Sequence, residues 1–179
     1  MVAGLVRRNA LDDANAAIRS LRAGTAGWSR VVSDAPMAGG IKLMVDPEAR
    51  ADIRLRSPAG RLMEIEARVE RPGRWLGLHV PLALYQTAGL GIVGITARAT
   101  APEALAVSAC LRSGLRGGFV DAFFDKAMAV HFQPLQHIDT MEPDRRVDLP
   151  ARADWRELIL FLPTHSFSLS LHDLRFFAA

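Results

Sequence analysis

The end of the chain carries the pattern that most restricts the fold. Two apolar-rich stretches, Glu157 to Pro163 and Phe167 to Phe177, predict two long strands joined by a short turn over residues 163–166. In the second stretch apolar and polar side chains alternate: Phe167, Leu169 and Leu171 against Ser168, Ser170 and His172. This alternation is typical of a strand with one face on a core and the other in water. It shifts by one residue at His172-Asp173, which predicts a β-bulge there.

Short strands are predicted along most of the remaining chain, between turns rich in glycine and proline. Their ranges are Ile41 to Val45, Asp52 to Arg56, Leu62 to Val69, Trp75 to Leu84, Leu90 to Arg98, Ala104 to Arg112, Phe119 to Asp125, Ala127 to Phe132 and Gln136 to Thr140. Many short strands at such spacing favour an all-β antiparallel sandwich of the jelly-roll type. The 179 residues are expected to form a single domain.

The N-terminal part is expected to differ from the rest. Leu11, Ala14, Ile18 and Leu21 recur at helical spacing and predict a helix from about Asp12 to Arg22. Residues 1–24 are therefore interpreted as a helical appendage. Residues 25–40 are expected to form a loop or edge segment, in which Trp28 plugs the edge of the sandwich.

Composition excludes several classes of protein. Basic residues exceed acidic ones by only three and are not clustered, so a nucleic-acid partner is not expected. No apolar run reaches membrane-spanning length and no signal-peptide pattern appears, which favours a cytoplasmic location. Cys110 is the only cysteine, and we interpret it as a small core residue.

The first candidate site lies on the predicted strand that begins at Trp75. Because Leu76 and Leu78 would point inward, Trp75 and His79 would share the opposite face. A flat indole beside a polar side chain suits sugar binding, since it stacks on the apolar face of a pyranose. The alternative is that both side chains are buried beneath a loop or the N-terminal helix.

A second candidate is the polar pair Arg112 and Asp121, on two strands joined by a glycine-rich turn. Opposite charges at facing positions of neighbouring strands form cross-strand pairs. This pair contributes to a ligand site or is only a structural ion pair. The turn between the strands lacks the spacing of a phosphate-binding loop.

A third set has the chemistry of metal ligands. It comprises His131, His137, Asp139 and the His172-Asp173 pair. His137 and Asp139 would lie on one face of an extended strand, which permits a metal without implying one. No helical zinc motif and no serine nucleophile elbow is present in the sequence.

The C-terminal strands resemble the ending of a known family. Trp155-Arg156-Glu157 leading to the segment Ser170 to Phe176 is similar to the last strands of carbohydrate-binding jelly-roll modules of the galactose-binding-like type. The resemblance implies glycan binding, and Asp173 matches an aspartate that contributes to a structural calcium site in that family. The chain departs from the family at its start, where a helix replaces the usual opening strand.

These observations lead to one hypothesis and two alternatives. The chain is expected to be a non-catalytic glycan-binding sandwich whose ligand contacts are Trp75, His79, Arg112, Asp121 and His172, with structural calcium at Asp173 and no other cofactor. The first alternative is a structural or assembly protein, phage-like or a subunit of a complex, that binds a protein partner or forms a homo-oligomer. The second is a cupin-like metal enzyme or a glycan-active hydrolase, in which His131, His137, Asp139 and Glu64 or Glu66 would converge.

Overall fold

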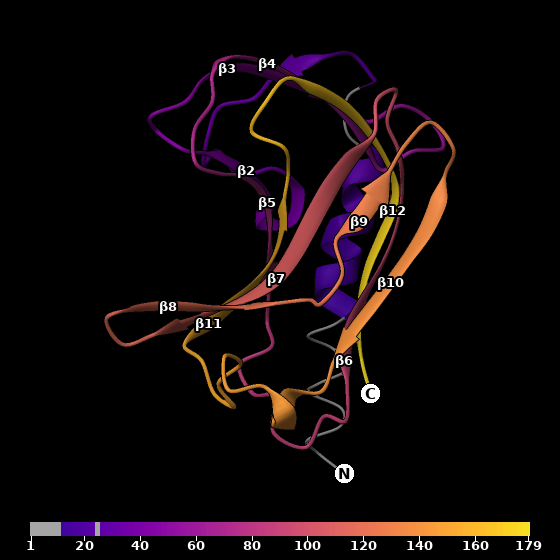
Figure 1. Cartoon of the computed structure of the whole chain (residues 1–179). Coiled ribbons are helices and arrows are strands. Elements are labelled where there is room, and N and C mark those ends of the chain that lie inside the picture. Colours follow the sequence, from indigo (N-terminus) through magenta and orange to yellow (C-terminus); the bar gives the residue numbers. More distant parts are fainter. Residues whose placement is uncertain (1–11, 24–25) are drawn as a thin grey trace.

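The computed structural model describes residues 12–23 and 26–179, and these residues form two antiparallel sheets packed face to face (Figure 1). Sheet A has the strand order β1 (Ser29–Arg30), β3 (Arg50–Arg56), β4 (Met63–Arg71), β12 (Phe167–Ala178), β6 (Val93–Thr100) and β10 (Leu135–Met141). Sheet B has the order β2 (Lys42–Val45), β5 (Leu76–Leu82), β11 (Trp155–Phe161), β7 (Leu105–Leu115) and β8 (Gly118–Phe123). The short strand β9 (Met128–Val130) pairs with β7.

Helical structure is limited in the described part of the chain. An α-helix covers residues 12–20 and continues into the 3-10 turn η1 (Leu21–Ala23). Two further 3-10 turns, η2 (Ala38–Gly40) and η3 (Pro143–Arg145), lie in connections between strands. The prediction of a helical appendage over residues 1–24 falls partly on residues 1–11 and 24, which lie outside the described residues. No described helix has both the length and the apolar character needed to cross a membrane.

The core lies between the two sheets and follows the alternation seen in the sequence. Ile65 on β4 and Leu169 on β12 face it from sheet A, and Leu78 on β5 and Leu158 on β11 face it from sheet B. Their neighbours in sequence point to the two outer faces. The all-β sandwich predicted from the sequence is therefore confirmed.

The two long C-terminal strands are confirmed, but they do not pair with each other. β11 pairs with β5 and β7 in sheet B, whereas β12 pairs with β4 and β6 in sheet A. The turn over residues 163–166 thus carries the chain from one sheet to the other. The register of β12 against β6 shifts between Leu171 and Asp173, so the predicted bulge is present at His172.

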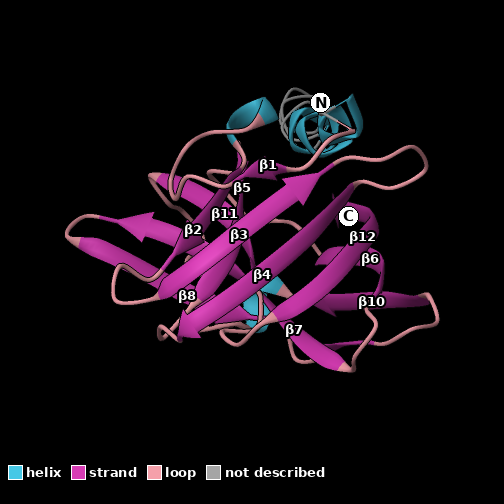
Figure 2. Cartoon of the chain, turned by 90° about the horizontal axis from the view of Figure 1, so that it is seen from above, coloured by secondary structure: helices cyan, strands magenta, loops and turns pink. Residues whose placement is uncertain are grey.

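The helix closes the part of β12 that β4 leaves unpaired. The β4 partners of β12 end at Leu171, and beyond it Asn15 of the helix takes the place of a neighbouring strand. The Asn15 side-chain amide donates to the Phe176 carbonyl at 2.7 Å and accepts from the Phe176 N–H at 3.0 Å. Figure 2 shows the helix nearly end-on at this margin of the sandwich. The helix therefore closes the open end of β12, whereas Trp28 directly precedes β1, which is the edge strand of sheet A.

Candidate functional site

The outward face of sheet B brings together most of the predicted site residues. Strand register places its side chains in rows that cross the sheet. One row contains Trp155, Gly114 and Phe119; the next contains Pro81, Glu157, Arg112 and Asp121; the third contains Lys42, His79, Ile159, Cys110 and Phe123. His79, Arg112 and Asp121, predicted as ligand contacts from the sequence, thus share one face. We call this surface the sheet B face.

The first row forms an aromatic platform. A Cβ atom at Gly114 would lie 2.1 Å from two atoms of the Trp155 indole, so the ring rests directly on the Gly114 backbone. Trp155 is 42% exposed, which leaves the outer side of its indole accessible to a ligand. Only glycine at position 114 provides this space, because any other residue would place a side-chain carbon inside the ring.

The second row is a charged strip beside the platform. Arg112 Nε and Nη2 each donate to Asp121 at 2.7 Å, in a two-pronged pair that joins β7 and β8. The guanidinium also lies 3.8 Å from the centroid of the Phe119 ring. Hydrogen bonding to Asp121 raises the pKa of Arg112 above its ordinary value, so the charge is fixed. The sequence prediction of a cross-strand Arg-Asp pair is confirmed.

A buried histidine connects the second row to the third. His79 is 3% exposed, and its Nδ1 lies 2.9 Å from a carboxylate oxygen of Glu157. The imidazole sits over Gly77, where a Cβ would lie 2.9 Å from His79 Nε2. Among the described residues, Nε2 has no hydrogen-bond partner. The alternative interpretation from the sequence, burial of His79, is therefore the observed one for this residue.

The centre of the sheet B face is apolar. Ile159 and Cys110 are fully buried although they lie outside the core cluster, and the rings of Phe123 and Phe161 stack with centroids 5.7 Å apart. Burial raises the pKa of Cys110 from 9.0 to about 12, which keeps its thiol protonated at neutral pH. The interpretation of Cys110 as a packing residue agrees with this environment.

A cavity adjoins the platform on its other side. It has a volume of about 360 Å³ and lies between the helix of residues 12–20 and the strands β5 and β11. Tyr85, which is 57% exposed, and Trp155 both line it. The cavity extends the accessible aromatic surface from the sheet B face toward the helix.

The remaining predicted residues lie elsewhere. Trp75 directly precedes β5, is half-buried, and is separated from Trp155 by more than about 20 Å along the strands at the usual rise per residue. His172 lies on the outer side of sheet A, where its Nε2 is 2.9 Å from Thr100 Oγ1. Burial, with the nearby Arg61 and Arg98, lowers the pKa of His172. The five predicted contacts therefore do not form one site.

Asp173, the predicted calcium ligand, is engaged by arginines. One carboxylate oxygen lies 3.0 Å from Arg22 and the other 3.2 Å from Arg175. Calcium sites in proteins gather several oxygen ligands, and the described residues contain no group of three or more histidine, cysteine or acidic side chains placed to hold a metal. This donor set does not fit calcium.

The residues proposed for an enzyme do not converge. Glu64 and Glu66 lie on the outer side of β4, whereas register places His137 and Asp139 of β10 on the inward side of sheet A. Asp139 accepts hydrogen bonds from the backbone N–H groups of Lys126 and Thr140, so its carboxylate has a structural role. The set is divided between two sides of one sheet.

Sequence reasoning missed Trp155, Glu157, Phe119 and Tyr85. The first three alternate with inward residues on β11 and β8, and that alternation was available in the sequence. Their proximity depends on which strands pair, because β7 and β11 are separated by some forty residues. The outward register of Trp155 on its strand is the signal that could have identified it, whereas its pairing with Gly114 is known only from the structure.

Comparison with solved structures identifies the architecture. The chain aligns over 86% of its length with 96% of the CBM22-1 xylan-binding domain of Paenibacillus barcinonensis Xyn10C, at a TM-score of 0.52 and 8% identity. A CBM4 structure aligns with 84% of the chain and 95% of its own, at a TM-score of 0.55 and 11% identity. The chain has the jelly-roll fold of carbohydrate-binding modules. The jelly-roll fold implied by the resemblance of the C-terminal strands is thereby confirmed.

The fold of this chain is also similar to that of an enzyme. A cyclase from Fischerella sp. TAU, in complex with 4-(1H-indol-3-yl)butan-2-one, aligns with 85% of this chain and 88% of its own, at a TM-score of 0.55 and 10% identity. No protein-family model and no curated protein matches the sequence. Identities this low establish the fold alone, because one fold hosts many functions.

Proposed function

We propose that the protein is a non-catalytic glycan-binding module whose ligand lies on the sheet B face, stacked on Trp155. The observation that carries this proposal is the indole resting on Gly114 with its other side exposed. A planar ring held flat on a sheet presents apolar surface to the C–H groups of a sugar at little entropic cost.

The charged strip supplies the directional contacts that such a ligand needs. A guanidinium has five N–H donors, and the pair with Asp121 uses two of its nitrogens, so donors of Arg112 remain for sugar hydroxyls. The oxygens of Asp121 and Glu157 accept further hydrogen bonds. Because these side chains already hold one another, the site is organised before the ligand arrives.

The arrangement favours binding over catalysis. His79 is buried beneath its neighbours, and Cys110 has a pKa of about 12. Neither side chain reaches the surface as a base or nucleophile. The pairing of Arg112 with Asp121 leaves no pair of free carboxylates for glycoside hydrolysis on this strip.

The structural neighbours suggest the first ligands to test. One is described as xylan-binding, and another, a family 11 module from Clostridium thermocellum, was determined with a β-1,3-1,4-mixed-linked tetrasaccharide. A face with one exposed tryptophan platform suits one or two units of such a chain. Trp75, which directly precedes β5, stays a predicted contact for a longer ligand.

A glycan array followed by titration calorimetry tests the proposal. The array compares the full chain with Trp155→Ala, and Val147→Ala in the exposed segment after η3 is the control. We expect saturable binding to one glycan class that Trp155→Ala weakens and Val147→Ala does not. Unchanged binding by a folded Trp155→Ala protein would contradict the assignment to the sheet B face.

A further inference from the structure

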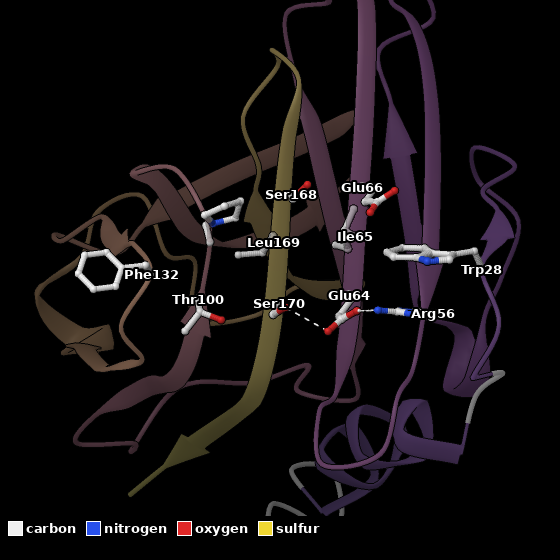
Figure 3. Close-up of a pocket in the computed structure, with 12 residues that line it drawn as sticks. Trp28, Arg56, Glu64, Ile65, Glu66, Thr100, Phe132, Ser168, Leu169 and Ser170 are labelled. Carbon is white, nitrogen blue, oxygen red and sulfur yellow. Dashed lines mark hydrogen bonds and ion pairs between the residues drawn. The ribbon is translucent and has the colours of Figure 1, made fainter.

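A groove of about 260 Å³ crosses the outer side of sheet A, on the opposite face of the sandwich from Trp155 (Figure 3). Trp28 borders one end and Phe132 the other, and side chains of β3, β4, β6 and β12 form the floor. With strands about 4.8 Å apart, the floor is about 15 Å wide. We call this surface the sheet A groove.

Both ends of the groove are exposed aromatic side chains. Trp28 is 38% exposed and is held by Arg56, whose guanidinium lies 4.5 Å from the centroid of the indole. Phe132 is 73% exposed, and its ring meets His131 edge-on at 5.4 Å. Neither ring belongs to the core cluster. Two solvent-facing aromatics at opposite ends of a polar groove have no evident role in stabilising the fold.

The floor contains one carboxylate that is neutralised and one that is not. Glu64 accepts from Arg56 at 2.7 Å, contacts Arg61 at 3.3 Å, and accepts from Ser170 at 3.3 Å. Glu66, the next outward residue on β4, has no hydrogen-bond or ion-pair partner among the residues that the structure describes. Arg54 faces it in register, but that guanidinium pairs with Asp52 at 3.2 Å.

Ser168 completes the free part of the floor. It is the cross-strand partner of Glu66, and in the described part of the chain its hydroxyl is likewise without a partner. Figure 3 shows Ser168 and Glu66 side by side, with Glu66 drawn on the opposite side of the Trp28 indole from Arg56. A half-buried carboxylate accepts strong hydrogen bonds from hydroxyl donors.

From this geometry we propose that the sheet A groove is a second sugar site, selective for neutral oligosaccharides. The aromatic ends stack on sugar rings, Glu66 accepts hydrogen bonds from sugar hydroxyls, and Ser168 donates or accepts. The unpaired charge of Glu66 repels uronic acids and other anionic sugars. The proposal shares with the proposed function only the chemical class of the ligand, and it does not depend on the sheet B face.

Two sites on opposite sheets give the molecule a property that neither has alone. A ligand on the sheet A groove and one on the sheet B face point away from each other, so a single chain of this protein can hold two polysaccharide strands. Binding to a polymer that reaches both sites gains affinity through effective concentration.

Calorimetry with short probes separates the two sites. The probes are xylotetraose, cellotetraose and a β-1,3-1,4-mixed-linked tetrasaccharide, with tetragalacturonate as the anionic comparison. The full chain is compared with Trp28→Ala, Trp155→Ala and the double variant. We expect two neutral probe molecules per wild-type chain, one for each single variant and none for the double variant.

Glu66→Gln tests the groove without removing an aromatic ring. In the Trp155→Ala background it is expected to weaken binding of the neutral probe about tenfold, because a charged acceptor is lost. It should also relieve the rejection of tetragalacturonate. Glu70→Gln, on the same side of β4 but outside the groove, is the matched control.

The outcomes distinguish the two proposals. Loss of all neutral-probe binding in folded Trp155→Ala would overturn the second site and leave the proposed function intact. Loss of all binding in Trp28→Ala, with none lost in Trp155→Ala, would support the groove and contradict the sheet B face. Failure of every neutral probe to bind the wild-type chain would overturn both.

Discussion

The indole of Trp155 rests on the backbone of Gly114, its cross-strand partner on β7, so closely that a Cβ at position 114 would lie 2.1 Å from the ring. The tryptophan thus depends on a residue some forty positions earlier in the chain. This relationship, and not the presence of a tryptophan alone, is what creates the aromatic platform on the sheet B face.

Gly114→Ala should remove the platform while leaving the fold intact. The new methyl group displaces the indole, but Trp155 is 42% exposed and can turn outward, so we expect a loss of only about 1 kcal/mol in the free energy of unfolding. A sugar that buries about 80 Å² on the ring gains about 2 kcal/mol, so its Kd should rise about 30-fold.

Urea unfolding and calorimetry measure these two effects. The double variant Gly114→Ala/Trp155→Ala should bind no more weakly than Trp155→Ala, because both changes remove the same platform. Additive losses of affinity would show that Gly114 acts in some other way.

Asn15→Asp should destabilise the edge of β12. The carboxylate still accepts from the Phe176 N–H but cannot donate to the Phe176 carbonyl, which it faces at 2.7 Å in place of the amide. We expect the free energy of unfolding to fall by about 1–3 kcal/mol. Ser20→Ala, on the exposed side of the same helix, is the control in urea unfolding, and an equal loss there would contradict the role of Asn15 as a substitute strand.

Sequence patterns predicted the structural features that are decided by residues close together along the chain. The alternation before His172 predicted both β12 and its bulge, and the two sides of one hairpin predicted the Arg112–Asp121 pair. The contact of Trp28 with Arg56 was not predicted, because no local pattern reveals a cation–π contact with a distant residue. His172 was grouped with Arg112 for a similar reason, since the sheet to which a strand belongs is decided by pairing across the whole chain.

Cys110 should make the free energy of unfolding depend on pH in the alkaline range. Its pKa is raised from 9.0 to about 12 by burial, so above pH 9 the unfolded chain loses the thiol proton while the folded chain keeps it. The folded state then binds more protons, and stability falls as pH rises from 9 toward 12, by up to about 1.4 kcal/mol per pH unit.

Urea unfolding at pH 8 and pH 10.5 measures this dependence. Wild type should lose about 1–2 kcal/mol more than Cys110→Ala between the two pH values, since other titrating groups are common to both proteins. An identical loss in the two proteins would mean that the thiol is not protected by the fold.

The Arg112–Asp121 pair should have separable roles in stability and in binding. Both side chains are about one-fifth exposed, at 19% and 18%, so solvent screening limits the contribution of the pair to about 1 kcal/mol. Arg112→Ala and Asp121→Ala should each lower the free energy of unfolding by about that amount. In the exchanged variant Arg112→Asp/Asp121→Arg the ion pair can form again with its charges reversed, so we expect most of this stability to return.

The stacking of the guanidinium on Phe119 and the position of its donors beside Trp155 are not restored in the exchanged variant. Glycan affinity should therefore stay as low as in Arg112→Ala, and calorimetry on the exchanged variant checks this. Recovery of affinity together with stability would mean that the pair serves the sheet B face only as a structural link between β7 and β8.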